Sequence, residues 1–295
     1  MNTRKRSLNS FLCVEKKRQF SSEIQSMKHI HILWAVMLTF LTVLALPAHA
    51  ARFNPKRTQK IASENDFVQL VENMANSMQP TAYIAFEKKM SPLFLKNLNR
   101  AMYFNHATHY YYYFRDNQIQ VKFNFADSAL LLAAYRNPKL RKKLTPEQKE
   151  ALKIAEECIK KCVASAKKRE DIVLFLHDEV AKLCEYDTGK PNQSCIRVLL
   201  HHKGDCGAYA RTMYLFLSML DIPCHVIQGE NISGGPHCWN LVQFDSGRWY
   251  HVDSCKDDRF GGDKNPYKYF GLTDEQNRKF HIWDEEYFPA TPIDK

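Results

Sequence analysis

The sequence lacks several features that would place it in common protein classes. No Cys-x-x-Cys pair occurs among its nine cysteines, which argues against a zinc ribbon or a thioredoxin-type motif. It contains no internal repeat and no low-complexity tract. Its N-terminal apolar run, residues 32–46, is shorter than the roughly 20 residues that a membrane-spanning helix needs. With 45% hydrophobic and 25% charged residues, the composition is that of an ordinary globular protein.

The net charge of +10 is concentrated near the N-terminus. The first fifty residues hold seven Lys or Arg and two acidic residues, so the rest of the chain carries only +5. A mildly basic, solvated surface accounts for that remainder. We therefore expect no nucleic-acid partner.

The first fifty residues have the form of an export signal. A basic stretch precedes the apolar run, and Pro47 and the small-x-small tripeptide Ala-His-Ala at 48–50 follow it. We expect residues 1–50 to be a signal peptide, with an uncleaved membrane anchor as the alternative. The remainder is then exported, as a secreted, periplasmic or cell-surface protein, and meets the membrane only if the leader stays attached.

Local patterns predict a small α+β accessory region over residues 51–166. Apolar spacing predicts helices at 63–78 and 91–102. Alternation of apolar and polar residues predicts a β-hairpin formed by 110–114 and 118–125. A capping box at Thr145, with proline next and Gln148 at the third helical position, predicts the start of a further helix.

A second domain is expected over residues 167–295, beginning with a helix at 171–184. Cys184 and Cys195 flank a polar loop and are the first pair to test for a disulfide, although the sequence leaves the disulfide pattern open. The acidic segment that holds Asp257, Asp258 and Asp263 is expected to be a solvated loop rather than a calcium site.

A nucleophile is predicted at Cys206. Asp205 is placed to cap an apolar helix that ends before Pro223, so Cys206 falls at the first helical position. The exposed backbone N–H groups and the helix dipole favour an anion there. A cysteine needs such help because the thiolate is its reactive form.

A base and its orienting group are predicted on the hairpin that follows. The turn at 245–247 joins strands at 237–244 and 248–254. Antiparallel pairing then brings His237, at the start of the first strand, beside Asp253, at the end of the second. A carboxylate in this place can fix the tautomer of a histidine and stabilise its protonated form.

Several ordered motifs resemble those of the transglutaminase-like superfamily, particularly its bacterial, exported members. They cover about residues 171–289 and comprise Gly-x-Cys-x-x-Tyr-Ala from Gly204, Ile-Pro at 222–223, His-x-Trp-Asn from His237, Trp-Tyr-x-Val-Asp from Trp249, an acidic loop from Lys256, Tyr-Phe-Gly-Leu-Thr-Asp-Glu from Tyr269 and His-Ile-Trp-Asp from His281. Two residues depart from the pattern: Cys238 stands where a small residue is usual, and Cys255 adds a second thiol near the site.

The resemblance implies an α+β fold with a papain-like core, in which the active-site helix packs on an antiparallel sheet. It also implies a catalytic triad of Cys206, His237 and Asp253, acyl transfer through a thioester, and an oxyanion site that includes the backbone N–H of Cys206. No metal or other cofactor is implied. Tyr209 and Trp239 are candidate substrate-binding residues, with packing inside the protein as the alternative for each.

The expected function is therefore that of a cysteine peptidase or amidase acting on protein or peptide amides, with cell-envelope components among the candidate partners. A glutamine cross-linking transglutaminase uses the same acylation and differs only in its acceptor, an amine in place of water. The alternative outside the enzymes is a surface binding module that keeps the fold without turnover.

Overall fold

The structure, a computed structural model, describes residues 58–87, 107–115, 118–189, 192–261 and 266–293. All of these residues belong to one compact unit, residues 54–295. The expected signal peptide and the expected helix at 91–102 lie outside the described residues. Among those that are described, no helix is long and apolar enough to cross a membrane.

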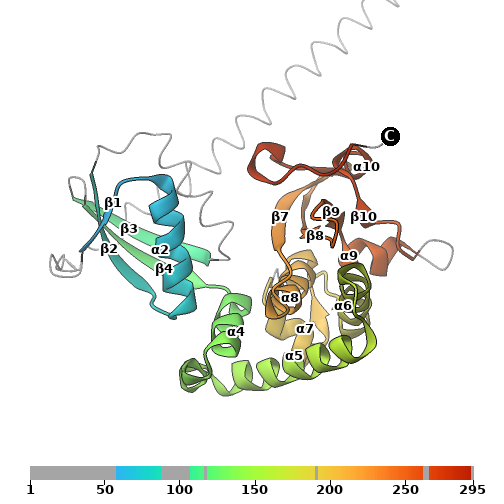
Figure 1. Cartoon of the computed structure of the whole chain (residues 1–295), viewed down its shortest axis with the longest axis horizontal. Coiled ribbons are helices and arrows are strands. Elements are labelled where there is room, and N and C mark those ends of the chain that lie inside the picture. The colour runs from blue at the N-terminus through green and yellow to red at the C-terminus, as the bar shows by residue number, and fades with distance from the viewer. Residues whose placement is uncertain (1–57, 88–106, 116–117, 190–191, 262–265, 294–295) are drawn as a thin grey trace, which may run out of the picture. The chain divides into compact units, whose positions relative to one another are not determined.

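A four-stranded sheet with one helix forms the N-terminal part of the described chain (Figure 1). Its elements are β1 (Thr58–Ile61), α2 (Glu64–Asn76), β2 (Thr81–Phe86), β3 (Ala107–Arg115) and β4 (Gln118–Phe125). The strand order is β1-β2-β4-β3, with β1 parallel to β2 and the other pairs antiparallel. The predicted first helix is confirmed, with a capping box between Ser63 and Asp66 at its start.

The predicted hairpin is also confirmed, because β3 pairs with β4 through Phe114 opposite Ile119. Along β4, Val121 and Phe123 are buried while Lys122 is exposed, as the alternation predicts. Gln120 departs from the alternation and is buried as well.

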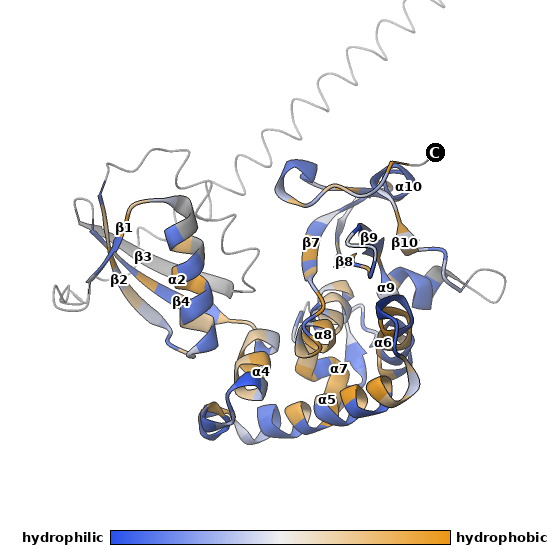
Figure 2. Cartoon of the chain, viewed as in Figure 1, coloured by the Kyte–Doolittle hydropathy of each residue, from blue (hydrophilic) through white to orange (hydrophobic). Residues whose placement is uncertain are grey.

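Helices carry the chain from this sheet to the site. They are α4 (Asp127–Arg136), the 3₁₀ turn η2 (Pro138–Lys143), α5 (Pro146–Ser165), α6 (Arg169–Leu183), α7 (Cys195–His201) and α8 (Cys206–Met219). The capping box at Thr145 forms as predicted, with Gln148 completing it. In Figure 2, α8 is hydrophobic along most of its length, whereas α5 alternates between hydrophobic and hydrophilic residues.

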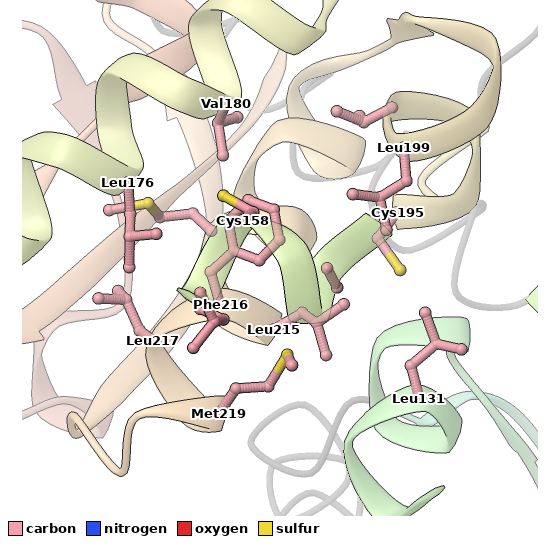
Figure 3. Packing of buried hydrophobic residues seen from close by; sticks show 14 of the residues in the cluster. Leu131, Cys158, Leu176, Val180, Cys195, Leu199, Leu215, Phe216, Leu217 and Met219 are labelled. Carbon is pink, nitrogen blue, oxygen red and sulfur yellow. The ribbon is translucent and has the colours of Figure 1, made fainter. Parts of the chain in front are cut away.

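The main hydrophobic core lies around α8. Figure 3 shows side chains from α4, α5, α6, α7 and α8 gathered around this helix, among them Leu131, Cys158, Leu176, Leu199 and Phe216. The expected boundary between residues 166 and 167 cuts across this cluster. That boundary remains a prediction, but α4 and α5 share the core of the helices that follow it.

A five-stranded antiparallel sheet packs against α8. It has the order β10-β9-β8-β7-β11 and is formed by β7 (Cys224–Asn231), β8 (Pro236–Gln243), β9 (Trp249–Val252), β10 (Phe270–Leu272) and β11 (His281–Ile282). The Asn240 amide of β8 donates a hydrogen bond to the Ala210 carbonyl of α8 at 3.0 Å and joins sheet to helix. The predicted α+β fold with an active-site helix on an antiparallel sheet is confirmed.

Short elements complete the described chain. They are β5 (Glu185–Tyr186), β6 (Lys203–Gly204), α9 (Ser254–Lys256), the π-turn η3 (Asp257–Gly261), α10 (Asp274–Asn277) and the 3₁₀ turn η4 (Glu285–Tyr287). The eight cysteines from Cys158 onward are all free thiols. The candidate disulfide between Cys184 and Cys195 is therefore not formed. Cys184 ends α6 with its sulfur near the Glu185 carbonyl oxygen at 3.7 Å, whereas Cys195 opens α7 in the core.

Candidate active site

Cys206 is the first residue of α8, as the sequence predicts. Asp205 caps the helix, because one of its carboxylate oxygens accepts the Ala208 N–H at 3.0 Å. The other oxygen accepts the N–H of Asn192 at 3.0 Å and ties the preceding loop to the helix start. The sulfur of Cys206 is thus held at the positive end of a buried helix.

His237 and Asp253 lie together, as the hairpin predicts. Nε2 of His237 is 2.7 Å from an Asp253 carboxylate oxygen, and both side chains are buried. The other Asp253 oxygen accepts the backbone N–H of Lys256 at 3.0 Å, because Asp253 caps α9. With Nε2 bound to the carboxylate, Nδ1 is the ring nitrogen of His237 available to the thiol of Cys206.

These contacts shift the pKa values of all three groups. A hydrogen bond from Cys238 contributes most to lowering the pKa of Cys206, to about 5; burial opposes it and the contact with His237 adds to it. Burial is the largest single influence on His237 and opposes its protonated form, but the charge and hydrogen bond of Asp253 and the contact with Cys206 together outweigh burial and raise the pKa of His237 to about 9. Asp253 is fully buried, yet His237 and then His281 hold its pKa below the ordinary value. The arrangement favours a thiolate beside an imidazolium.

Cys238, the departure from the family pattern, contacts Cys206. It is buried on β8 in a small cluster with Ala210 and Val226, against which Cys206 packs. The Cys206 thiolate raises the pKa of Cys238 well above its ordinary value, mainly through the hydrogen bond between the two groups. Cys238 is therefore the protonated partner and donates its S–H to Cys206. The second added thiol, Cys255, is buried close behind the triad.

A second histidine shares the triad carboxylate. Nε2 of His281, on β11, lies 3.2 Å from the Asp253 oxygen that His237 also contacts. The rings of the two histidines are parallel within 1° with centroids 5.1 Å apart. The sequence motif that contains His281 was part of the family resemblance, but the motif alone did not place it beside the triad.

The surroundings of His281 favour a neutral imidazole ring. Nδ1 of His281 is 2.7 Å from the side-chain amide of Asn277. With the amide oxygen facing the ring, the Asn277 amide nitrogen is buried without a partner, and the only polar contact of His281 Nε2 among the described residues is the one with Asp253 at 3.2 Å. Turning the amide end for end lets its nitrogen donate to Nδ1, so that Nε2–H points at Asp253. Burial lowers the pKa of His281, which agrees with a neutral ring that donates to the carboxylate.

Trp239 lies behind these rings and does not face a substrate. Only 1% of it is exposed, and its ring stacks on His281 at 4.3 Å between centroids. Its indole N–H donates to Nδ1 of His251 at 2.9 Å, and Nε2 of His251 donates to Asp274 at 2.8 Å. The substrate-binding role considered for Trp239 is therefore corrected to support of the two histidines.

Tyr209 is likewise corrected from a substrate-binding residue to a core residue. It is fully buried, one helical turn after Cys206. Its hydroxyl lies 2.7 Å from the Cys184 carbonyl oxygen and 2.7 Å from a carboxylate oxygen of Asp258. Burial raises the pKa of Tyr209, so its hydroxyl remains a proton donor. The spacing that placed Tyr209 near Cys206 is right, but the side chain points inward.

The acidic segment is not simply a solvated loop. Asp257 is buried, with one carboxylate oxygen 3.1 Å from Nε2 of His177 on α6. Its other oxygen accepts the N–H of Tyr269 at 2.9 Å. Asp258 is exposed but contacts Tyr209, and Asp263 lies outside the described residues. Asp257 therefore attaches the loop that follows Asp253 to helix α6.

One group among the described residues has the donor types and spacing of a metal site. It consists of His237, Asp253 and His281, whose ligand atoms lie within 4.8 Å of one another. Asp253 already contacts Nε2 of both histidines, at 2.7 Å and 3.2 Å, so the group is a carboxylate between two imidazoles.

Residues 153–254, which include Cys206, His237 and Asp253, match the model of the transglutaminase-like superfamily. The chain therefore contains a transglutaminase-like core, as the motifs predicted. No curated protein gives a significant match.

Solved structures with similarity to the chain include three with low sequence identity. A candidate cysteine protease of Cytophaga hutchinsonii is 19% identical, with a TM-score of 0.31 and coverage of 35% of this chain and 37% of that one. A protein described as a TGase is 17% identical, with a TM-score of 0.34 and coverage of 68% and 59%. The periplasmic domain of TgpA from Pseudomonas aeruginosa is 17% identical, with a TM-score of 0.31 and coverage of 47% and 55%. The matches span less than two thirds of each of these proteins.

Proposed function

We propose that this transglutaminase-like chain is a cysteine enzyme that cleaves protein or peptide amides through a thioester intermediate. The observation that carries the proposal is the 2.7 Å contact between His237 and Asp253 beside a cysteine at a helix N-terminus. A nucleophile, a base and a group that orients the base are what thiol acyl transfer requires.

In the proposed mechanism, the Cys206 thiolate attacks the amide carbonyl carbon. The carbonyl oxygen becomes an oxyanion, and the C–N bond breaks as His237 gives its proton to the departing nitrogen. The product is a thioester on Cys206 and a free amine, or ammonia for a side-chain amide. His237 then removes a proton from an incoming water, whose oxygen attacks the thioester and regenerates the thiolate.

Two groups are proposed to stabilise the oxyanion. One is the backbone N–H of Cys206. The other is the side-chain amide of Gln193, which lies against Gly207: a Cβ at position 207 would be 2.5 Å from Cγ of Gln193. The Gln193 oxygen accepts a hydrogen bond from Arg211 at 3.4 Å, which leaves the amide N–H groups for a substrate.

Export is proposed from the leader sequence alone. Under this proposal the enzyme meets peptides, proteins or cell-envelope components outside the cytoplasm. If the leader is not cleaved, the same enzyme would be attached to the membrane through its N-terminal segment.

The function is tested with the mature protein, a glutamine-containing peptide and a labelled primary amine. We expect ammonia or amine release to exceed incorporation of the label, and both to disappear in Cys206→Ala. Predominant incorporation would instead identify the protein as a transglutaminase. Labelling of Cys206 by a thiol-directed probe at the same rate as the exposed thiols of the unfolded chain, with no turnover, would identify a binding module.

A further inference from the structure

A cleft of about 360 Å³ opens beside the triad and carries no acidic residue among its described lining. His237 belongs to both the cleft and the triad. The other lining residues used here are Tyr186, Lys256, Arg259, Tyr269 and Phe280. Three different segments, β5, the α9–η3 region and the chain from Tyr269 to β11, thus bring two cations and three aromatic rings to the edge of the site.

Lys256 is the cation best placed to meet a substrate. It is half-buried, and its amino group donates to the Phe280 carbonyl at 3.4 Å. The same group lies 5.2 Å from the ring centroid of Tyr269 and 5.9 Å from that of Phe280. Within the described residues Lys256 forms no salt bridge with a carboxylate. The charge of Asp253 is felt at Lys256, but the carboxylate of Asp253 contacts His237 and His281.

Arg259 and a third cation, Lys268, also lie over aromatic rings. The Arg259 guanidinium is 3.7 Å from the ring centroid of Tyr186. The Lys268 amino group is 5.2 Å from the ring of Tyr269 and 5.3 Å from that of Phe280. For Lys256, the two ring faces and one carbonyl compensate the positive charge only in part, because they carry partial charges. A ligand that offers a full negative charge would complete the coordination of Lys256.

We infer that this cleft binds a carboxylate of the substrate, so that the enzyme prefers amides close to an acidic residue or to a free C-terminal carboxylate. The inference rests on the proposed amide cleavage, because the cleft would hold the substrate carboxylate beside the amide that is cleaved with the help of His237. Burial favours the neutral form of Lys256, and a bound carboxylate would favour the charged form. A half-buried, charge-assisted hydrogen bond of this kind is stronger than one between neutral groups.

The first test compares peptides that differ only by Glu or Gln on either side of the cleaved amide. We expect kcat/KM to be about tenfold higher for the Glu peptide than for the Gln peptide when the residue lies on one particular side of the cleaved amide. A parallel pair with free and amidated C-termini shows whether a terminal carboxylate supplies the charge. Turnover at equal rates within every pair would overturn the inference and leave the proposed function standing.

Variants locate the preference in the cleft. Lys256→Gln should remove most of the acidic preference, and Lys256→Glu should reverse it in favour of a Lys-containing peptide. Lys279→Gln removes an exposed lysine next to Phe280 and should leave the preference as in the unaltered enzyme. A Glu-to-Gln ratio that is the same in Lys256→Gln and in the unaltered enzyme would contradict the assignment.

A binding measurement separates the two proposals. Acidic peptides should slow the labelling of Cys206 by a thiol-directed probe more than their neutral counterparts do, and Lys256→Gln should abolish this difference. If no peptide is cleaved but the acidic peptides still protect Cys206, the proposed function fails while the anion site stands. Equal protection by acidic and neutral peptides counts against the site.

Discussion

At the residue scale, the ionisation of Cys206 depends on the thiol beside it. The lowered pKa, about 5, keeps the thiolate present above that pH, and the raised pKa of His237, about 9, keeps the imidazolium present below that one. The reactive pair therefore exists between these two values. We expect kcat/KM to be bell-shaped with pH, falling below about 5 as the sulfur is protonated and above about 9 as His237 is deprotonated.

Cys238→Ala should move the acid limb of that profile upward by about one pH unit, because the thiolate loses one donor. Cys238→Ser keeps a donor at the same place and should leave the limb nearer to its original position. The measurement is the pH dependence of Cys206 labelling in both variants. An unchanged limb in Cys238→Ala would mean that helix and histidine alone ionise Cys206.

His281 is expected to act as a positioning residue for the triad. His281→Phe keeps a ring against Trp239 but removes the hydrogen bond to Asp253 and should reduce kcat by roughly ten- to a hundredfold. His281→Gln can still donate to the carboxylate and should recover part of the loss. Equal losses in both variants, accompanied by equal falls in the unfolding midpoint, would indicate a structural role alone.

At the scale of elements, the start of α8 depends on Gly207, which has no side chain. Gly207 allows Gln193 to lie against the helix, where its amide is proposed to meet the oxyanion. Gln193→Ala should lower kcat by about a hundredfold, as removal of an oxyanion donor does in other acyl-transfer enzymes. The rate of Cys206 labelling should change little, since labelling forms no oxyanion. A parallel fall in labelling would show that Gln193 instead supports the thiolate.

The elements divide into those that the sequence predicts and those that it does not. The helix that begins at Cys206 and the hairpin that joins His237 to Asp253 follow from a cap, a turn and regular spacing, all of which are local. Helix α4 was not predicted, because its N-cap Ala126 makes no side-chain cap and its apolar residues are satisfied only by tertiary packing.

The inward direction of Tyr209, the burial of Asp257 and the position of His281 likewise depend on partners far away in the chain. Asp257 meets His177 across 80 residues, a distance over which no spacing rule applies. The triad was therefore readable from local patterns, whereas the groups that support it were not.

At the scale of the whole molecule, the helices before residue 167 belong to the core of the site. Leu152 and Ile159 of α5 are buried against the cluster around α8. Each such side chain stabilises the fold by about 1.5–3 kcal/mol, and a typical domain has only about 5–15 kcal/mol in total.

A chain that begins at residue 167 should therefore fail to unfold cooperatively in denaturant, with α6 and α8 exposing their apolar faces. The matched control is a chain that begins at residue 54, which keeps the whole compact unit and should unfold with a single sharp transition. Cooperative unfolding of the shorter chain at a similar midpoint would show that α4 and α5 are dispensable.

Strand β11 carries His281 to Asp253 by pairing with β7, and it does so from a segment far downstream of the nucleophile. During synthesis, Cys206 and the hairpin with His237 emerge first, and the second donor to the carboxylate emerges only afterwards. A nascent chain thus holds Cys206 and His237 before His281 reaches Asp253. Under the proposed function, the order of the elements delays full reactivity until β11 has joined the sheet.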